Sequence, residues 1–306
     1  MGALLEYRNC PGCGHNDFEV LFESNMEQSD FQEDIDTVYM LPGGKYGRHV
    51  KCRNCRLIYV NPIEKASKIN HDYFKRESDD ASIIRRSRLH AAESQVRLVK
   101  KYNGGRSLLD VGCGEGFFLF KASETGYITK GIELSQDATV YARREFGLDV
   151  EAKPIEESQF PQNCFDVATL WQVLEHVPYP LTILKEVNRI LKPGGLLVAS
   201  TPDIEGIPAR ILRNKWWNMR RIHLNQFTTK TLKNIIENAG FTKASRVSYR
   251  ESMSLAMLVI PVLKRFGVYE YVKDLFSASS IFGRTISKMR IIYPSRLDTC
   301  TVIGFK

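Results

Sequence analysis

The sequence predicts an α/β protein with a mainly parallel sheet and helices on both faces, preceded by a small cysteine-rich segment. Three observations support this prediction. Apolar, strand-like runs alternate with helical periods from residue 105 onward, a glycine-rich loop separates the first of these strands from its helix, and two Cys-x-x-Cys pairs lie near the N-terminus. A chain of 306 residues suits one large domain plus a smaller one, and 43% hydrophobic with 25% charged residues is an ordinary globular composition.

The chain is expected to fold in three parts. Residues 1–62 should form short strands and turns around the cysteines, and residues 63–104 a polar helical linker or lid. Residues 105–306 should form the α/β domain, with an irregular insert at 203–227 and a second insert at 250–296. The expected strands are 107–111, 128–132, 150, 165–171, 196–200, 241–249 and 298–305, and the expected helices are 116–125, 136–146, 181–191 and 228–239.

The central motif is the run DVGCGEG at 110–116, which follows a strand and opens a helix. Glycines let the backbone turn tightly and approach a ligand without a Cβ clash. Glu133, 21 residues after Gly112, ends the next strand, where a carboxylate can accept hydrogen bonds from both hydroxyls of a ribose. Such a loop alone is a weak signal of nucleotide binding. Its Gly-x-Gly-x-Gly spacing differs from the Gly-x-Gly-x-x-Gly spacing typical of proteins that bind nicotinamide cofactors.

Further motifs follow in order: GIELS at 131–135, FDVATLWQVLEHV at 165–177, LKPGG at 191–195, HLNQFTTKTL at 223–232 and NAGF at 238–241. With these, residues 105–306 resemble the class I methyltransferases that use S-adenosylmethionine (SAM) and act on small molecules. The resemblance implies a Rossmann-like seven-stranded sheet of order 3-2-1-4-5-7-6. It also implies that SAM contacts Asp110, Gly112, Cys113, Gly114, Gly116, Glu133, Leu134, Ile155, Glu156, Trp171, Gln172 and His176. The family often has Asp at the adenine position, and the segment 153–156 has none.

Methyl transfer depends mainly on aligning acceptor, methyl and sulfur, and a hydroxyl or an acidic carbon as acceptor also needs a base. His223 is the best candidate for this catalytic base, because it follows the connection after the fifth strand, where acceptors bind in this fold. It could instead be a histidine that packs against Phe227. His176 fits a structural place beside the cofactor, and Cys113 fits a packing role because no basic residue neighbours it in sequence.

The two cysteine pairs, Cys10/Cys13 and Cys52/Cys55, predict a structural Zn²⁺ site of four thiolates, which resembles the zinc-binding N-terminus attached to many of these methyltransferases. Free thiols are the alternative, and His15 or His49 could replace one ligand. With three further scattered cysteines and no export signal in the sequence, a reducing cytoplasm fits better than a disulfide framework.

The charge distribution bears on the acceptor. Residues 204–306 hold 18 Lys and Arg against 6 Asp and Glu, which suggests an anionic acceptor, a membrane surface or merely a solvated basic face. Arginines and two tryptophans in 210–221 could clamp an acceptor or form a lid. The apolar run 254–265 could touch a membrane, line the acceptor pocket or form a dimer contact, and it is far too short to span a bilayer.

A small-molecule acceptor is therefore expected, such as a sugar, a lipid-linked glycan or a secondary metabolite, with S-adenosylhomocysteine as the other product. RNA methylation is the alternative, in which the zinc segment and the basic C-terminal third grip nucleic acid. Against RNA, residues 1–62 hold 6 Lys and Arg against 9 Asp and Glu. A scaffold that has lost its cofactor would be expected to lose the glycines and Glu133, which are intact.

Overall fold

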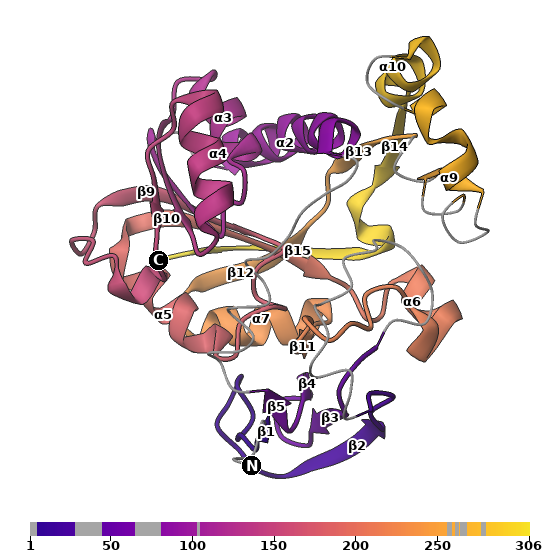
Figure 1. Ribbon diagram of the computed structural model, residues 1–306. Helices are drawn as coiled ribbons and strands as arrows, with labels where there is room; N and C mark the ends of the chain where they lie inside the picture. Colours follow the sequence, from indigo (N-terminus) through magenta and orange to yellow (C-terminus); the bar gives the residue numbers. More distant parts are fainter. Residues whose placement is uncertain are drawn as a thin grey trace.

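The computed structural model of the chain describes residues 5–27, 45–64, 81–102, 105–255, 259–260, 263, 268–276 and 280–306. A central twisted sheet carries helices on both faces, and the N-terminal segment packs below it (Figure 1). The expected α/β class, with a seven-stranded and mostly parallel central sheet, is confirmed.

The central sheet contains the strands β6 (Ser107–Val111), β7 (Ile128–Glu133), β8 (Val150–Ala152), β9 (Phe165–Trp171), β10 (Leu191–Pro202), β12 (Thr242–Val247) and β15 (Thr299–Phe305). Their order across the sheet is β12-β15-β10-β9-β6-β7-β8. Only β15 runs antiparallel to its neighbours β10 and β12, and the others pair in parallel. Strands buried on both faces explain the continuous apolar runs of the sequence, such as Leu196–Ala199, whose side chains are fully buried.

Helices α2 (Ala81–Tyr102), α3 (Phe117–Ser123) and α4 (Gln136–Phe146) lie on one face of the sheet, and α5 (Pro180–Ile190) and α7 (Thr229–Asn238) lie on the other (Figure 1). Helix α5 buries Ile183, Leu184, Val187 and Ile190, which is the helical spacing that the sequence shows. Helix α7 begins at the N-cap Thr228 with a reciprocal capping box, as expected.

The N-terminal segment contains β1 (Leu5–Glu6), β2 (Phe18–Phe22), β3 (His49–Cys52), β4 (Ile58–Val60) and β5 (Ile63–Glu64). Strands β2, β3 and β4 form an antiparallel sheet, whose fourth strand is β11 (Asn225–Gln226). The insert 203–227 was expected to be irregular, and this was wrong. It contains α6 (Ile207–Leu212), the 3-10 turn η3 (Arg213–Lys215) and β11, with turns and irregular backbone between them. Strand β11 escapes local patterns because its partner lies about 165 residues away in sequence.

The prediction for 63–104 was right for α2 and wrong at its start, since residues 63–64 form β5 and pair with β1. Residues 65–80 and 103–104 lie outside the described residues. The second insert holds the hairpin β13 (Arg250–Ser254) and β14 (Arg290–Pro294), with α9 (Tyr269–Val272), the 3-10 turn η4 (Lys273–Phe276) and α10 (Ile281–Lys288) beside it.

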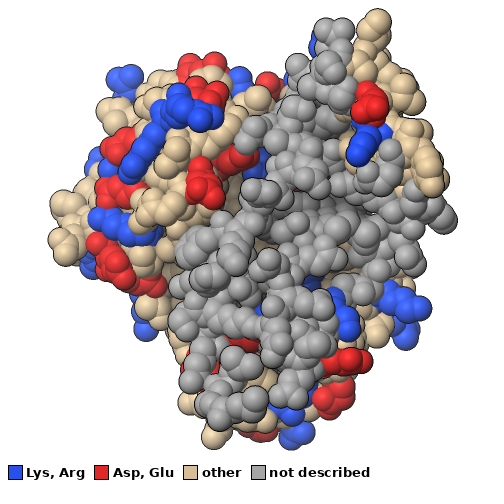
Figure 2. Space-filling model, in the orientation of Figure 1, with Lys and Arg blue, Asp and Glu red and all other residues tan. Residues whose placement is uncertain are grey.

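The apolar run 254–265 lies partly outside the described residues. Its described apolar members pack with residues of the same insert, forming a small cluster with Tyr269, Phe276 and Ile286. None of the helices in the described part of the chain has the length and hydropathy to cross a bilayer. On the face drawn in Figure 2, Lys and Arg side chains are interspersed with Asp and Glu over the lobe of α3 and α4.

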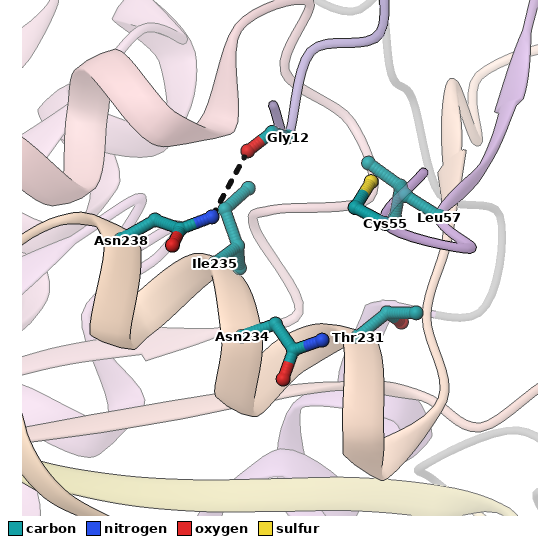
Figure 3. A pocket seen from close by; sticks show the side chains of 7 residues that line it. All are labelled: Gly12, Cys55, Leu57, Thr231, Asn234, Ile235 and Asn238. Atoms are coloured by element: carbon teal, nitrogen blue, oxygen red, sulfur yellow. Dashed lines mark hydrogen bonds between the residues drawn. The ribbon is translucent and has the colours of Figure 1, made fainter. Parts of the chain in front are cut away.

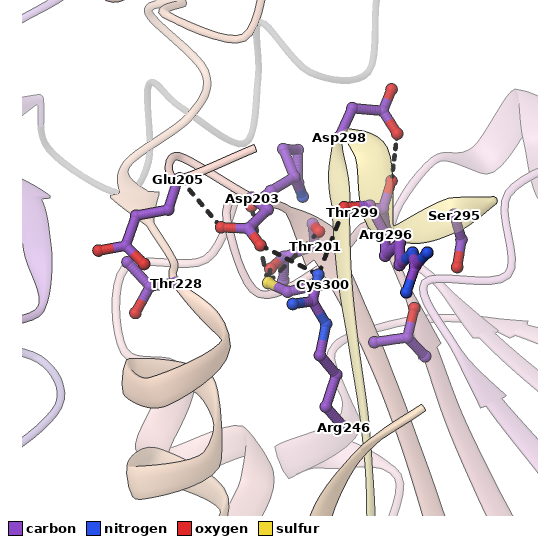
Figure 4. A network of polar contacts seen from close by, with 12 residues as sticks. Thr201, Asp203, Glu205, Thr228, Arg246, Ser295, Arg296, Asp298, Thr299 and Cys300 are labelled. Carbon is purple, nitrogen blue, oxygen red and sulfur yellow. Dashed lines mark hydrogen bonds and ion pairs between the residues drawn. The ribbon is translucent and has the colours of Figure 1, made fainter. Parts of the chain in front are cut away.

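A polar network ties the end of β10 to the start of β15 (Figure 4). Asp203 Oδ2 lies 3.5 Å from the Arg246 guanidinium, and Asp203 Oδ1 accepts a 3.0 Å hydrogen bond from the Glu205 backbone. Beneath it, Thr201 Oγ1 and Cys300 Sγ are 3.1 Å apart. The network fixes where the chain leaves the sheet toward the insert 203–227.

Candidate functional site

The glycine loop lies between β6 and α3, at the carboxyl ends of the parallel strands. Gly112, Gly114 and Gly116 all have positive φ, at 70°, 55° and 82°, so each suits glycine. At Gly112 a Cβ would lie 2.7 Å from Val173 Cγ2, whereas at Gly114 it would meet nothing within 4 Å. The loop is therefore packed at its first glycine and open at its second, which is the position where a ligand can approach bare backbone.

Glu133, at the end of β7, holds the loop. Its Oε2 accepts a 2.8 Å hydrogen bond from the Gly114 backbone N–H, and its Oε1 accepts one of 2.9 Å from Ser135. The residue is only 4% exposed. Each carboxylate oxygen has a second lone pair, so Glu133 retains capacity to accept hydrogen bonds from a ligand diol.

Asp110, at the penultimate position of β6, is buried and accepts a 2.6 Å hydrogen bond from Thr169 Oγ1 on β9. Burial raises the pKa of Asp110 to about 8, partly offset by the Thr169 hydroxyl and reinforced by the nearby Glu133 carboxylate. The carboxyl therefore fastens β6 to β9 from inside the sheet.

The other expected cofactor contacts surround this loop. Leu134 is half-buried beside Glu133, and Ile155 and Glu156 lie in the 3-10 turn η2 (Ile155–Glu157) after β8, buried and exposed respectively. Burial raises the pKa of the Cys113 thiol well above its usual range, in keeping with a packing role.

Trp171 and Gln172 lie at the carboxyl end of β9. The Trp171 ring contacts Phe118 of α3 at a centroid distance of 5.4 Å, and its buried Nε1 has no hydrogen-bond partner within the described ranges. Gln172 is exposed and has φ of 57°, a left-handed conformation that a non-glycine residue rarely adopts. The Gln172 amide contacts Ser200 Oγ of β10 at 3.4 Å, whereas Trp171 packs on the helix that follows the loop.

His176 and His223 come together, although 46 residues separate them. Their rings are edge to face with centroids 4.8 Å apart. The Nδ1 of His176 contacts the Ile222 carbonyl at 3.1 Å, and the Nδ1 of His223 contacts the Asn218 carbonyl at 2.9 Å. A carbonyl only accepts, so each Nδ1 carries a proton and each neutral ring has its lone pair on Nε2.

Glu175 completes this group, and sequence alone does not reveal it because a buried carboxyl looks like a surface residue until its surroundings are known. Its carboxylate lies 4.0 Å from His176 Nε2 and is only 2% exposed. Burial raises the pKa of Glu175 to about 8. Ligand atoms of the three residues lie within 4.8 Å of one another, so the group could relay a proton or hold a divalent cation.

Two further residues that sequence reasoning missed hold this group in place. The buried Arg8 guanidinium donates to the carbonyls of Val60 and Leu224, at 3.2 and 3.0 Å, and to that of Pro178. Asn225 Nδ2 donates to Leu174 and Val177, at 3.0 and 2.8 Å. These bonds join the N-terminal segment to the two turns that carry Glu175, His176 and His223.

The basic segment 210–221 is divided between surface and interior. Arg210, Arg213 and Lys215 are exposed. Trp216 is fully buried with Tyr46, Ala209 and Met219, so it belongs to the core. Arg221 makes a buried, bidentate ion pair with Glu64, at 2.6 and 2.7 Å, and is therefore committed to the fold.

The four cysteines of the two pairs converge. Cys10 Sγ lies 3.4 Å from Cys55 Sγ, Cys13 Sγ lies 3.6 Å from Cys52 Sγ, and all four sulfurs lie within 4.8 Å of one another. These distances are too long for disulfides, and all four cysteines are free. A tetrahedron with Zn–S bonds of about 2.3 Å has sulfur–sulfur edges of roughly 3.8 Å, so the donor set and spacing fit zinc.

The first cysteine knuckle packs on α7. Figure 3 shows Gly12 and Leu57 against Ile235, with the Asn238 amide reaching the Gly12 carbonyl at 3.5 Å. His15 contacts the Cys13 carbonyl, and His49 is buried with its Nδ1 bound to the Gly47 carbonyl. The group of clustered metal-ligating atoms in the described chain contains neither histidine.

Comparisons with known proteins bear on this arrangement. Ubiquinone biosynthesis O-methyltransferase of Actinobacillus pleuropneumoniae serotype 5b is 37% identical over 114 residues, covering 33% of this chain and 49% of that protein. The enzyme of that name from Pseudomonas paraeruginosa is 30% identical over 147 residues, covering 45% and 61%. The chain thus spans about half to three fifths of these relatives.

Among solved structures, phosphoethanolamine N-methyltransferase 2 of Haemonchus contortus in complex with SAM superimposes with a TM-score of 0.52 at 16% identity, covering 81% of this chain and 62% of that one. That likeness concerns the fold. A family model described as a methyltransferase domain matches residues 84–245, from α2 through β12. Because this match covers more than half of the 306 residues, the chain belongs to the family of methyltransferase domains.

Proposed function

We propose that the protein transfers a methyl group from SAM to a hydroxyl-bearing small molecule. The observation that carries the proposal is the glycine loop, open at Gly114 and facing Glu133, whose carboxylate can accept a ligand diol. A buried, unpartnered donor at Trp171 Nε1 stands beside it within the described chain. The bare backbone at Gly114 gives SAM room to approach. The Glu133 carboxylate suits its ribose, and the Trp171 donor suits its polar methionine end.

The proposed cofactor contacts are those expected from the sequence, apart from Asp110 and Cys113, whose buried side chains pack within the fold. Gly112, Gly114 and Gly116 provide backbone, Glu133 the ribose contact, and Asp110 orders the strand end. Leu134, Ile155 and Glu156 would flank the adenine, and Trp171, Gln172 and His176 the methionine end. When bound, SAM supplies an electrophilic methyl on its sulfonium, so the protein has mainly to align the acceptor and exclude water.

His223 is proposed as the base that removes the acceptor proton. Its Nδ1 lies 2.9 Å from the Asn218 carbonyl, and this contact orients the ring. The adjacent His176 ring packs edge to face on the His223 ring, and the buried Glu175 carboxyl lies 4.0 Å from His176 Nε2. His223→Ala should lower turnover at least tenfold while SAM affinity stays constant. Equal turnover would remove His223 from this role.

The acceptor is proposed to be a sugar, a lipid-linked glycan or a secondary metabolite. The curated relatives act, by their names, in ubiquinone biosynthesis as O-methyltransferases, which supports a small hydroxyl acceptor. RNA remains the alternative, favoured by the basic surplus of residues 204–306. Incubation with tritiated SAM and separate small-molecule and RNA pools decides between them, since label in RNA alone would reject the small-molecule proposal.

The N-terminal segment is proposed to hold one structural zinc through Cys10, Cys13, Cys52 and Cys55. Support comes from the convergence of the four sulfurs and from the packing of this N-terminal segment against α7. A closed set of four thiolates leaves no position for a substrate, so the metal would stabilise the fold. Four free thiols kept for a metal also favour a reducing compartment such as the cytoplasm.

Calorimetry tests the cofactor assignment directly. SAM should bind the wild-type protein, and Glu133→Ala should weaken binding by about 1–3 kcal/mol through loss of charge-assisted hydrogen bonds. Glu145→Gln, on the exposed end of α4, is the matched control and should bind normally. Absence of SAM binding at millimolar ligand would reject the proposal and favour a scaffold, and binding of NADH instead would indicate a nicotinamide site.

A further inference from the structure

The helices of the insert 250–296 form a small lobe that projects from the body of the protein. Helix α9, the turn η4 and helix α10 lie beyond the hairpin β13–β14, at the upper right in Figure 1, and residues 268–276 and 280–289 are called the insert lobe below. The lobe has a small apolar cluster of its own, which contains Tyr269, Phe276 and Ile286. Its inner face is therefore packed, and its outer face meets solvent.

The outer face of α9 and η4 is apolar. Val268, Tyr271 and Leu275 are all exposed, and Tyr271 is 90% exposed. Their spacing of three and four residues places them on one stripe of a helix. The buried residues Tyr269 and Phe276 adjoin this stripe, so the apolar arc of the helix is wider than the part that packs inside the lobe.

Helix α10 has the same property. Its first two residues, Ile281 and Phe282, are exposed, and Ile281 is 79% exposed. Met289, two turns after Ile281, is exposed on the same side. The inward side of the helix carries Gly283 and Ile286, which are buried. This helix too presents large apolar side chains outward as well as inward.

The two exposed faces meet at the tip of the lobe. The Ser280 hydroxyl donates to the Leu275 carbonyl and accepts a 2.8 Å hydrogen bond from the Gly283 backbone, which joins the end of η4 to the start of α10. The Phe276 and Phe282 rings pack edge to face with centroids 5.3 Å apart. Of the fifteen exposed large apolar side chains in the described chain, seven lie within residues 268–292. Such a concentration marks an interaction surface.

The charge of this region selects the partner. Residues 264–290 hold 6 Lys and Arg against 2 Asp and Glu, and Lys273 and Lys288 are exposed within the lobe. An anionic bilayer attracts basic side chains, while apolar and aromatic side chains enter the boundary between headgroups and acyl chains. A two-fold contact with a second copy would instead set the same positive charges against each other. The composition of the lobe therefore favours an anionic lipid surface over self-association.

We propose that the insert lobe docks the protein on an anionic phospholipid surface. Tyr271, Ile281 and Phe282 enter the headgroup boundary, and Lys273 and Lys288 contact the phosphate groups. The inference is independent of the proposed methyl transfer, because none of these residues belongs to the proposed cofactor or catalytic contacts.

Vesicle co-sedimentation with the full chain tests the proposal. The vesicles contain phosphatidylcholine alone or equal parts of phosphatidylcholine and phosphatidylglycerol. The wild-type protein should bind the anionic vesicles at least tenfold more tightly than the neutral ones, and added NaCl should weaken that binding. Ile281→Gln should weaken it at least fivefold through loss of apolar insertion, and Lys288→Gln about fivefold through loss of one charge.

Two matched controls lie outside the lobe. Ile128→Gln changes an isoleucine of β7 that is 71% exposed, and Lys230→Gln changes an exposed lysine of α7, so both should bind vesicles like the wild type. Melting temperatures show that each variant folds. Equal binding to both kinds of vesicle, binding to neither, or unchanged binding by Ile281→Gln would overturn the proposal. A wild-type dimer in light scattering that Ile281→Gln dissociates would assign the patch to a second copy and overturn it as well.

Discussion

Arg8→Met tests whether the N-terminal segment holds the histidine pair in place. The Arg8 guanidinium donates to three backbone carbonyls, those of Val60, Pro178 and Leu224, and lies 3.4 Å from the Asn225 amide oxygen. The residue is only 7% exposed, so methionine would occupy a similar volume and remove the guanidinium donor from these carbonyls. The Leu224 carbonyl keeps the 2.9 Å hydrogen bond from the Val60 backbone, so the Val60 and Pro178 carbonyls bear the loss. A stranded buried carbonyl costs about 1–3 kcal/mol.

Loss of the buried charge offsets part of this cost. Burial lowers the pKa of Arg8 to about 10, so the native chain already bears a desolvation penalty that methionine removes. The net expectation is a loss of about 2–3 kcal/mol in the free energy of unfolding, together with lower turnover at unchanged SAM affinity.

Urea denaturation followed by circular dichroism measures the stability, and labelled-SAM turnover measures the activity. Arg53→Met is the matched control, since Arg53 has a side-chain exposure of 60% and a single 3.8 Å contact with Asp17. It should change stability by less than about 0.5 kcal/mol. A change below about 1 kcal/mol in Arg8→Met would refute the idea that these hydrogen bonds hold the two turns together.

Three further predictions follow from the site. Gly114→Ala should cost about 1 kcal/mol of stability because of its positive φ, and it should reduce SAM affinity at least tenfold. Gly112→Ala should cost more stability, because its Cβ meets Val173. Thermal melting and calorimetry compare the two variants, and equal losses of stability and of SAM affinity would contradict the open position at Gly114. Burial raises the pKa of Asp110 to about 8, so its contribution to stability is complete below about pH 4 and is lost as pH rises through 8. Asp110→Asn should remove a slope of about 1.4 kcal/mol per pH unit from urea titrations between pH 5 and 7, and an unchanged slope would place the proton elsewhere. Native mass spectrometry should find one zinc per wild-type chain and none in Cys52→Ser, and a zinc-free wild type would contradict the metal site.

Local sequence patterns were sufficient to predict most of the helices and strands of the central domain. The strand 165–171 and the helix 136–146 appear at their expected bounds, because each has a strong apolar period and clear end signals. Helix α7 likewise lies within one residue of the expected range 228–239. The convergence of Cys10, Cys13, Cys52 and Cys55 was also predictable, since the knuckle spacing constrains geometry locally.

The remainder depends on contacts between distant parts of the chain. Asn225 and Gln226 are poor strand formers alone, and they become β11 only because β4 offers an edge. Arg8 and Glu175 carry no local signature, since a buried cation and a buried carboxyl look like surface residues until their surroundings are known. The pairing of His176 with His223 likewise needs the turn at 174–178 and the turn at 220–226 to meet.

Strand β11 makes the N-terminal segment and the rest of the chain depend on each other for folding. Antiparallel pairing of Tyr59 with Asn225 and of Ile58 with Gln226 means that a chain lacking the first 64 residues would expose the β11 backbone, while the isolated N-terminal piece would expose an apolar edge at β4. Open edges of this kind recruit other chains. Removing the N-terminal segment, or expressing it alone, should therefore yield aggregates and no smaller working enzyme. In the full chain, heat should melt both parts in a single transition.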